Sequence, residues 1–150
     1  MWCVALGRTL TTDTLRKRGI IITVWCFMCK NHQENLNHLF IHCVVAWELC
    51  SVIFCLFGVS WMMPHSVQEM LSCWMGLFGK RSNGGTWKAV PLCLMWCLWR
   101  ERNAWCFWGQ ELSVVKRKEL FLKSLYNWTS LSPTSSVVGF LEFLDFLSFL

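Results

Sequence analysis

The pattern of hydrophobic and polar positions along the chain predicts a mainly α-helical protein. Its clearest amphipathic helix begins at Ser66, where Ser66 and Glu69 have the spacing of a capping box: the hydroxyl accepts a backbone N–H and the carboxylate reaches back to the helix start. Apolar residues then recur on one face of this helix: Val67, Met70, Leu71, Trp74, Leu77 and Phe78. Gly79 is placed to end it.

A second helical region covers Leu36–Phe57, and we expect it to be broken near Cys43. Asn35 or Asn37 is suited to cap its start, because a short amide side chain accepts a backbone N–H of the first turn. Gly58 is placed to end it.

Two more helical regions follow a polar, glycine-containing loop at Lys80–Gly85. Trp87–Trp108 is almost entirely apolar, and we expect Pro91 to interrupt it, since proline lacks the N–H that a helix interior needs. Leu112–Trp128 carries several basic residues and forms the last region of this body.

Near the N-terminus, Thr11–Gly19 is predicted to form a short helix. Thr12 or Asp13 is suited to cap it and Gly19 to end it. Three cations occupy the last turn, where the helix dipole favours positive charge: Arg16, Lys17 and Arg18. The apolar, β-branched run Ile20–Trp25 then predicts a short strand.

The C-terminal part divides into a linker and an apolar tail. Ser130–Ser136 is rich in serine and contains a proline, as linkers often do. Phe140–Leu150 repeats a Phe-Leu-polar pattern, which indicates a docking helix or a peptide that binds a protein partner. We therefore divide the chain into residues 8–60, 61–130 and 131–150.

Candidate chemistry is concentrated in four residues that follow the predicted N-terminal helix within eighteen positions: Cys26, Cys29, His38 and Cys43. A Cys-x2-Cys turn presents two thiolates to one ion, and three thiolates with one imidazole suit tetrahedral Zn²⁺ with no open position. The spacing therefore predicts one structural zinc per chain, held in a small CCHC knuckle that packs on a body of three or four helices.

The alternative is a set of buried free thiols beside a surface histidine, since the chain has ten cysteines and some Cys-x2-Cys pairs arise by chance. His32 and His42 are spare nitrogen donors, but His42 directly precedes Cys43, which gives poor ligand geometry. Six other cysteines lie in apolar helical runs, where core packing is expected: Cys50, Cys55, Cys73, Cys93, Cys97 and Cys106.

Composition adds two constraints. The 150 residues include eleven Trp and eleven Phe, whose side chains need extensive burial. Any that stay exposed are expected to be contact surfaces or aggregation hazards. The net charge of +5 allows weak attraction to phosphate, although an ordinary solvated surface explains it equally well.

The cellular environment is expected to be reducing, in the cytoplasm or nucleus. The first ten residues include Arg8 and lack an apolar run of signal-peptide length, so the cysteines are expected as free thiols and metal ligands rather than as disulfides. Val44–Met63 is long and apolar enough to be weighed as a membrane span. Glu48 opposes this, although it lies near one end, because a carboxylate costs about 2.5–3.5 kcal/mol in the middle of a span.

No catalytic constellation emerges from the sequence. There is no glycine-rich phosphate loop, no pair of carboxylates in a plausible pocket context, and no local signature of a Cys–His nucleophile. A closed set of zinc ligands also leaves no position for a reactive water. We therefore do not expect an enzyme.

Two motifs resemble the zinc-binding domain that follows reverse transcriptase in plant non-LTR (LINE-type) retrotransposons. The first runs from the Thr12–Gly19 segment through the Cys-x2-Cys pair to Glu34-x3-His38-Leu39-Phe40-x2-Cys43. The second is Trp96-x2-Trp99-Arg100-Glu101-Arg102-Asn103-Ala104, followed by Phe107. The chain departs from the family pattern at Val44, where proline is frequent, and at Cys50, where tryptophan is common.

The resemblance implies that residues 8–60 are the zinc-binding domain and residues 61–130 its helical continuation. It also implies a detached piece of a retrotransposon polyprotein, because neither a polymerase palm nor an endonuclease fits in this length. Single-stranded RNA or DNA is the expected partner, contacted by Arg16, Lys17, Arg18 and Lys30, with Trp25 and Phe27 as stacking surfaces or as core. The alternatives are a membrane-associated or protein-interaction protein, and a retroelement remnant without function.

Overall fold

The computed structural model describes residues 9–20, 23–60, 62–77, 84–130 and 139–148. The helical elements are α2 (Thr12–Lys17), the π-helical turn η1 (His38–His42), α3 (Val44–Leu56), α4 (Val67–Leu77), α5 (Gly84–Trp108), α6 (Val114–Ser130) and α7 (Phe140–Ser148). Extended pairing within the described residues is limited to one antiparallel bridge between Trp25 and Gln33. The prediction of a mainly α-helical chain is confirmed.

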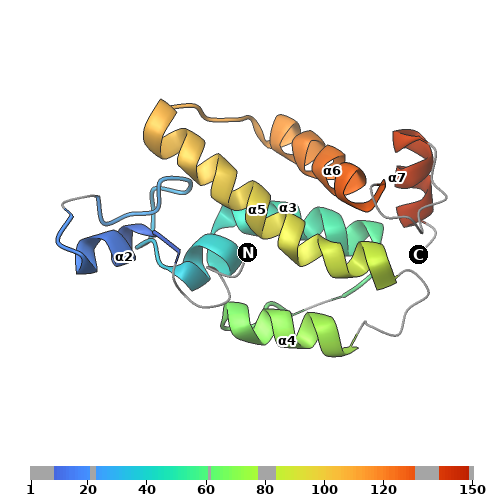
Figure 1. The fold of residues 1–150 in the computed structure, drawn as a ribbon, viewed down its shortest axis with the longest axis horizontal. Helices are drawn as coiled ribbons and strands as arrows, with labels where there is room; N and C mark the ends of the chain where they lie inside the picture. Colours follow the sequence, from blue (N-terminus) through green and yellow to red (C-terminus); the bar gives the residue numbers. More distant parts are fainter. Residues whose placement is uncertain (1–8, 21–22, 61, 78–83, 131–138, 149–150) are drawn as a thin grey trace.

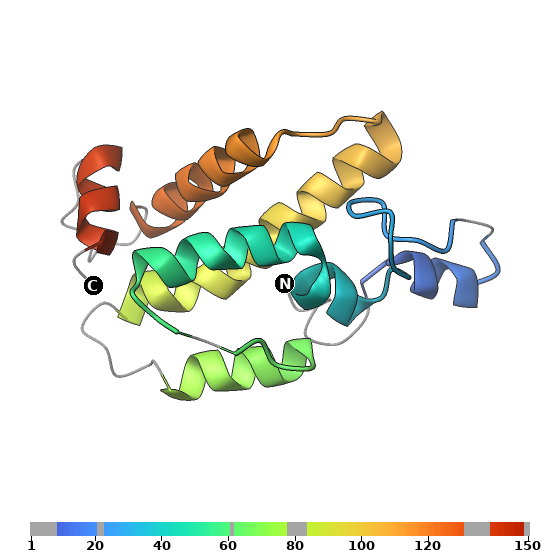
Figure 2. The same ribbon diagram turned by 180° about the vertical axis from the view of Figure 1, so that it is seen from behind.

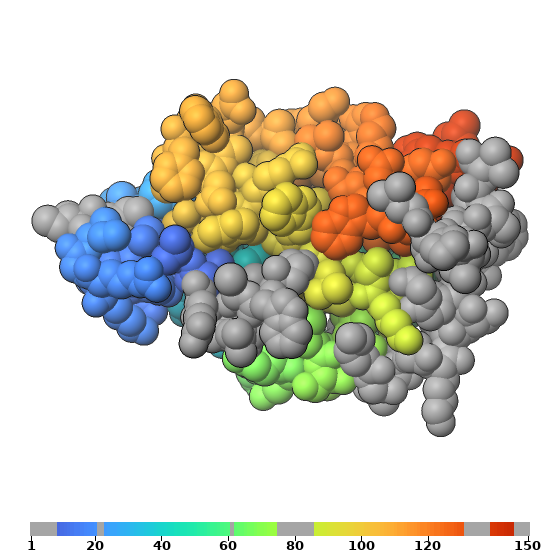
Figure 3. All heavy atoms as spheres, in the orientation of Figure 1, coloured from blue at the N-terminus to red at the C-terminus, as the bar shows by residue number. Residues whose placement is uncertain are grey.

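The long helix α5 is the centre of the body. It packs against α6 and also contacts α3 and α4, while α3 contacts α6 (Figure 1). Seen from behind, α2 and the cysteine-containing loop form one end of the molecule, and α7 stands beside α6 at the opposite end (Figure 2). The space-filling view shows the α2 segment as a lobe at that first end (Figure 3).

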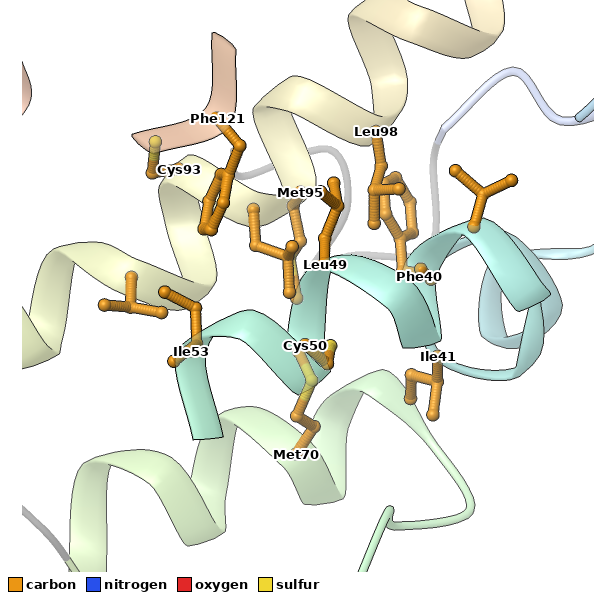
Figure 4. Close-up of a cluster of buried hydrophobic side chains, with 14 of the residues drawn as sticks. Phe40, Ile41, Leu49, Cys50, Ile53, Met70, Cys93, Met95, Leu98 and Phe121 are labelled. Atoms are coloured by element: carbon orange, nitrogen blue, oxygen red, sulfur yellow. The ribbon is translucent and has the colours of Figure 1, made fainter. Parts of the chain in front are cut away.

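The core lies where α3, α4, α5 and α6 face one another. Figure 4 shows Leu49 and Ile53 of α3 beside Met95 of α5 and Phe121 of α6. These four side chains are at most 1% exposed. Burial of each large apolar side chain contributes about 1.5–3 kcal/mol, so this contact stabilises the arrangement of the helices.

Helix α5 runs through Pro91, so the predicted interruption there is wrong. Proline cannot donate to the carbonyl four residues earlier, which belongs to Trp87. The indole Nε1–H of Trp74 in α4 donates to that carbonyl instead, at 3.0 Å, and the two indole rings stack with centroids 4.5 Å apart. A partner from another helix therefore satisfies the carbonyl, and α5 already begins at Gly84, within the predicted loop.

The predicted break at Cys43 is confirmed, because Cys43 has an extended backbone between η1 and α3. Asn35 caps the helical turn that leads into η1, because its side-chain oxygen accepts from the His38 backbone N–H at 2.8 Å. Asn37 accepts from the Val67 N–H at 3.1 Å and so ties the start of α4 to η1. Gly58 ends α3 with a φ of 58°, a conformation that residues with a Cβ rarely adopt.

The remaining helix ends differ in detail from expectation. Thr11, rather than Thr12 or Asp13, caps α2 by accepting from the Thr14 N–H, and Gly19 follows with a φ of 77°. At α4 the Ser66 hydroxyl accepts from the Glu69 N–H as predicted, but the Glu69 carboxylate accepts from the His65 N–H. Gly79 and part of the predicted strand at Ile20–Trp25 lie outside the described residues.

The other cysteines divide into core and surface. Cys50 and Cys93 are buried as predicted, whereas Cys97 and Cys106 are half-buried. Core packing was the wrong expectation for Cys55 and Cys73, which are exposed because α3 and α4 turn those positions away from the bundle.

The tail helix α7 packs on α6. Its Phe143 is 2% exposed and its ring lies 5.4 Å from that of Tyr126. The predicted linker falls almost entirely outside the described residues. The segment weighed as a membrane span contains α3, which ends at Leu56, and none of the helices in the described ranges combines the length and apolarity needed to cross a bilayer.

Candidate metal centre

The first two candidate ligands lie in a tight turn that is enclosed by the Trp25–Gln33 bridge. The Cys26 N–H donates to the His32 carbonyl at 2.7 Å, and the Lys30 N–H donates to the Cys26 carbonyl at 2.8 Å. Lys30 adopts a φ of 58°, which reverses the chain directly after Cys29. Both thiols of the Cys-x2-Cys element are thereby directed to one side of the loop, as a chelating turn requires.

The π-helical turn η1 positions the other two candidate ligands, His38 and Cys43. His38 and Cys43 are five residues apart, a spacing that separates side chains by about 140° around an α-helix. In a π-helix the same spacing leaves them only about 50° apart. The Cys43 N–H donates to the His38 carbonyl at 2.7 Å, which is the hydrogen bond of a π turn. The wider turn therefore brings the imidazole and the thiol to the same side.

The four side chains form one compact cluster. Their ligand atoms all lie within 4.8 Å of one another. Cys26 Sγ is 4.0 Å from Cys43 Sγ, and Cys29 Sγ is 3.2 Å from His38 Nε2. Zinc bond lengths of about 2.3 Å to sulfur and 2.0–2.1 Å to nitrogen give tetrahedral edges of roughly 3.8 Å and 3.5 Å. The donor set and its spacing fit a zinc ion.

The burial of the cluster is consistent with a structural metal position. Cys26 and Cys43 are fully buried, and His38 is 7% exposed. The hydrogen bond between the two sulfurs raises the pKa of Cys26 to about 12, with desolvation adding to the effect, and lowers the pKa of Cys43. A cation held by Cys26 and Cys43 would replace that shared proton, because thiols ligate metals as thiolates.

A buried ion pair anchors this centre to the helical body. The Glu34 carboxylate lies 2.8 Å from Arg102 Nη2 on α5, and the two side chains are 0% and 1% exposed. Glu34 also accepts from the Thr12 N–H at 2.9 Å, which links α2 to the same point. Glu34 lies in the loop between the two pairs of candidate ligands, but its side chain is buried because Arg102 and backbone donors replace its water.

A second, partly buried network joins three helices, and the sequence did not predict it. Arg117 of α6 lies 3.1 Å from Glu48 of α3 and 3.4 Å from Glu101 of α5. The Trp105 indole N–H also donates to Glu101, at 3.2 Å. The motif that contains Glu101 and Arg102 was singled out by resemblance, but nothing in its local pattern indicated these partners.

The predicted nucleic-acid contacts are on the surface. Arg16, Lys17 and Arg18 are exposed, and Lys17 pairs with Asp13 at 2.8 Å. Lys30 lies apart from these α2 cations, in the turn that holds Cys26 and Cys29, and its Nζ is 5.5 Å from the centre of the Trp105 ring. Of the two aromatic residues beside the first ligand, Trp25 is 55% exposed, whereas Phe27 is half-buried with its ring 5.3 Å from the Arg102 guanidinium carbon.

Comparison with known proteins supports a metal-binding role for the N-terminal third. Residues 1–49 match a family model described as zinc-binding in reverse transcriptase. This segment contains all four clustered ligands and Glu34, but it ends before α5. No curated protein and no solved structure matches the chain.

Proposed function

We propose that this chain is a structural-zinc module that binds single-stranded nucleic acid and derives from a retrotransposon polyprotein. The observation that carries the proposal is the convergence of Cys26, Cys29, His38 and Cys43 within the segment that matches the reverse-transcriptase zinc-binding family. Its plant LINE-type origin rests on the two sequence motifs. The module acts by binding rather than by catalysis, because a four-ligand site leaves zinc no position for water or substrate.

One zinc ion per chain is the first part of the proposal. The cluster supplies four ligands of the types that structural zinc prefers, and no other group of this kind occurs in the described ranges. Elemental analysis of protein purified without chelator should give one zinc per chain. A ratio near zero in protein that is folded would contradict this part.

Nucleic-acid binding is the second part. The net charge is +5, and four cations flank or lie within the zinc loop with exposed side chains: Arg16, Lys17, Arg18 and Lys30. Each phosphate contact adds about 0.7 to the salt slope for a single strand, so two to four contacts give a slope of roughly 1.5–3. Affinity for a labelled oligonucleotide should therefore be weak and should fall measurably with salt.

The decisive variant reverses Arg16, Lys17 and Arg18 to Glu. A matched control reverses Lys116, Lys118 and Lys123 of α6 to Glu, which changes the net charge by the same amount outside the metal loop. Zinc content and helicity are measured in both. The α2 variant should lose affinity and salt slope, and the α6 variant should lose less. Equal affinity and slope in parent and α2 variant would remove these cations from the site.

A further inference from the structure

We infer that a polar groove beside the metal centre binds the bases of a single strand; this inference rests on the proposed function and deepens it. The groove is lined by residues of α2, of the segment after Cys29, of η1 and of the start of α4, and it has a volume of about 670 Å³. Small-ligand sites range over about 300–1,000 Å³. The residues that carry the argument are Lys17, His32, Gln33, His42, His65 and Gln68.

Two amides in the groove are available to a ligand. Gln33 and Gln68 are exposed, and neither side chain has a hydrogen-bond partner among the described residues. Asn35 and Asn37 also line the groove, but their oxygens accept from backbone N–H groups of His38 and Val67. A primary amide offers a donor and an acceptor together, which is the combination that recognises the edge of an unpaired base.

Imidazole rings add flat surfaces to the same groove. His42 Nε2 lies 3.3 Å from the His65 carbonyl, so these two histidines sit together where η1 meets the start of α4. The His32 ring lies 5.4 Å from that of His38. Unstacked bases bind flat rings, including histidine, as well as polar edges. Leu36 is the one aliphatic side chain among the described residues that line the groove.

The charge of the groove favours a base over a bare anion. Lys17 lines it, but the Lys17 ammonium is paired with Asp13 at 2.8 Å, and Asp13 lines the groove as well. A free phosphate would meet that carboxylate. A strand can instead place its phosphates toward the exposed Arg16 and Arg18 and its bases in the neutral part of the groove.

The groove is also coupled to the metal centre. His38 belongs both to the metal cluster and to the lining of the groove. His32 also lines the groove, and its carbonyl accepts from the Cys26 N–H, so it lies in the same loop as the first ligands. Loss of the ion frees that loop, since the binding energy of a structural metal is folding energy. Chelation should therefore abolish base recognition.

The test uses a fluorescent dT12 oligonucleotide and a strand of equal length made of abasic sites. The variant His65→Ala/Gln68→Ala removes two groove side chains far from the metal ligands in sequence and leaves every cation in place. The control Gln110→Ala/Asn127→Ala removes two exposed polar side chains from the loop after α5 and from α6. Two lost hydrogen-bonding groups should weaken dT12 binding roughly 5- to 50-fold in the groove variant, with an unchanged salt slope. The control should bind as the parent does.

The possible outcomes distinguish failure of the proposed function from failure of the groove alone. If the parent binds no oligonucleotide, the proposed function fails and the groove fails with it. If the parent binds dT12 but the groove variant binds equally well with full zinc content, the groove is overturned and the proposed function stands. Equal affinity of the parent for dT12 and the abasic strand would also overturn base binding, because phosphates alone would then account for the interaction.

Discussion

The Glu34 carboxylate and the Arg102 guanidinium meet in the interior at 2.8 Å, although the two residues are 68 positions apart in the chain. Glu34 lies four residues before the candidate ligand His38, and Arg102 lies on α5. The pair therefore fixes the metal loop to the longest helix of the body. It also explains physically why both sequence motifs occur in one protein: each supplies one half of a buried contact.

Replacing Glu34 by Ala should destabilise the protein by about 3–5 kcal/mol, because it leaves the Arg102 guanidinium buried without a counter-charge. The free energy of unfolding is measured in urea with zinc present. Lys17→Ala, which breaks the exposed pair with Asp13, is the control and should cost less than about 1 kcal/mol. A loss for Glu34→Ala as small as that of the control would show that the pair does not hold the loop.

Replacing Cys29 or His38 by Ala should abolish stoichiometric zinc, because three remaining donors leave the tetrahedral site incomplete. Elemental analysis gives the zinc content of each purified variant. Cys55→Ala and Cys73→Ala change exposed cysteines outside the cluster and should retain a full equivalent. Full zinc in both ligand variants would refute the assignment of these residues.

Chelation should loosen residues 23–43 before the helical body. The turn that holds Cys26 and Cys29 and the π turn that ends at Cys43 depend on the cluster, whereas α6 is stabilised by packing against α5. Hydrogen exchange read by mass spectrometry, with and without chelator, should show faster exchange in the loop and little change in residues 114–130. Uniform acceleration over both segments would indicate instead that the whole chain unfolds with the metal.

Trp74→Phe should cost about 1–3 kcal/mol, because it leaves the buried Trp87 carbonyl without its indole donor. The cost should shrink in a Pro91→Ala background, where residue 91 regains an N–H for that carbonyl. A double-mutant cycle in urea measures this coupling. Trp47→Phe, at a half-exposed position of α3, is the control for loss of an indole. Purely additive effects would show that the proline and the indole are independent.

Local patterns predicted the features that depend on neighbouring residues. The break at Cys43, the stop at Gly58 and the hydroxyl cap at Ser66 follow from backbone geometry within a few residues. The proximity of the four candidate ligands belongs here as well, because they lie within eighteen positions of one another.

Predictions failed where the partner comes from another element. Pro91 reads locally as a helix breaker, but Trp74 from α4 supplies the missing donor. Cys55 and Cys73 lie in apolar runs, and only the orientation of α3 and α4 in the bundle exposes them.

The sequence by itself thus determined the helical class and the set of candidate metal ligands, because periodicity and ligand spacing are short-range properties of the chain. The tertiary structure decided that Glu34 is buried and paired with Arg102, that η1 widens into a π turn, and that a polar groove opens between α2 and α4. The burial of Glu34 and the groove depend on which distant segments come together. A charged residue in a loop sequence is solvated by default, and only a partner brought by another helix makes its burial favourable.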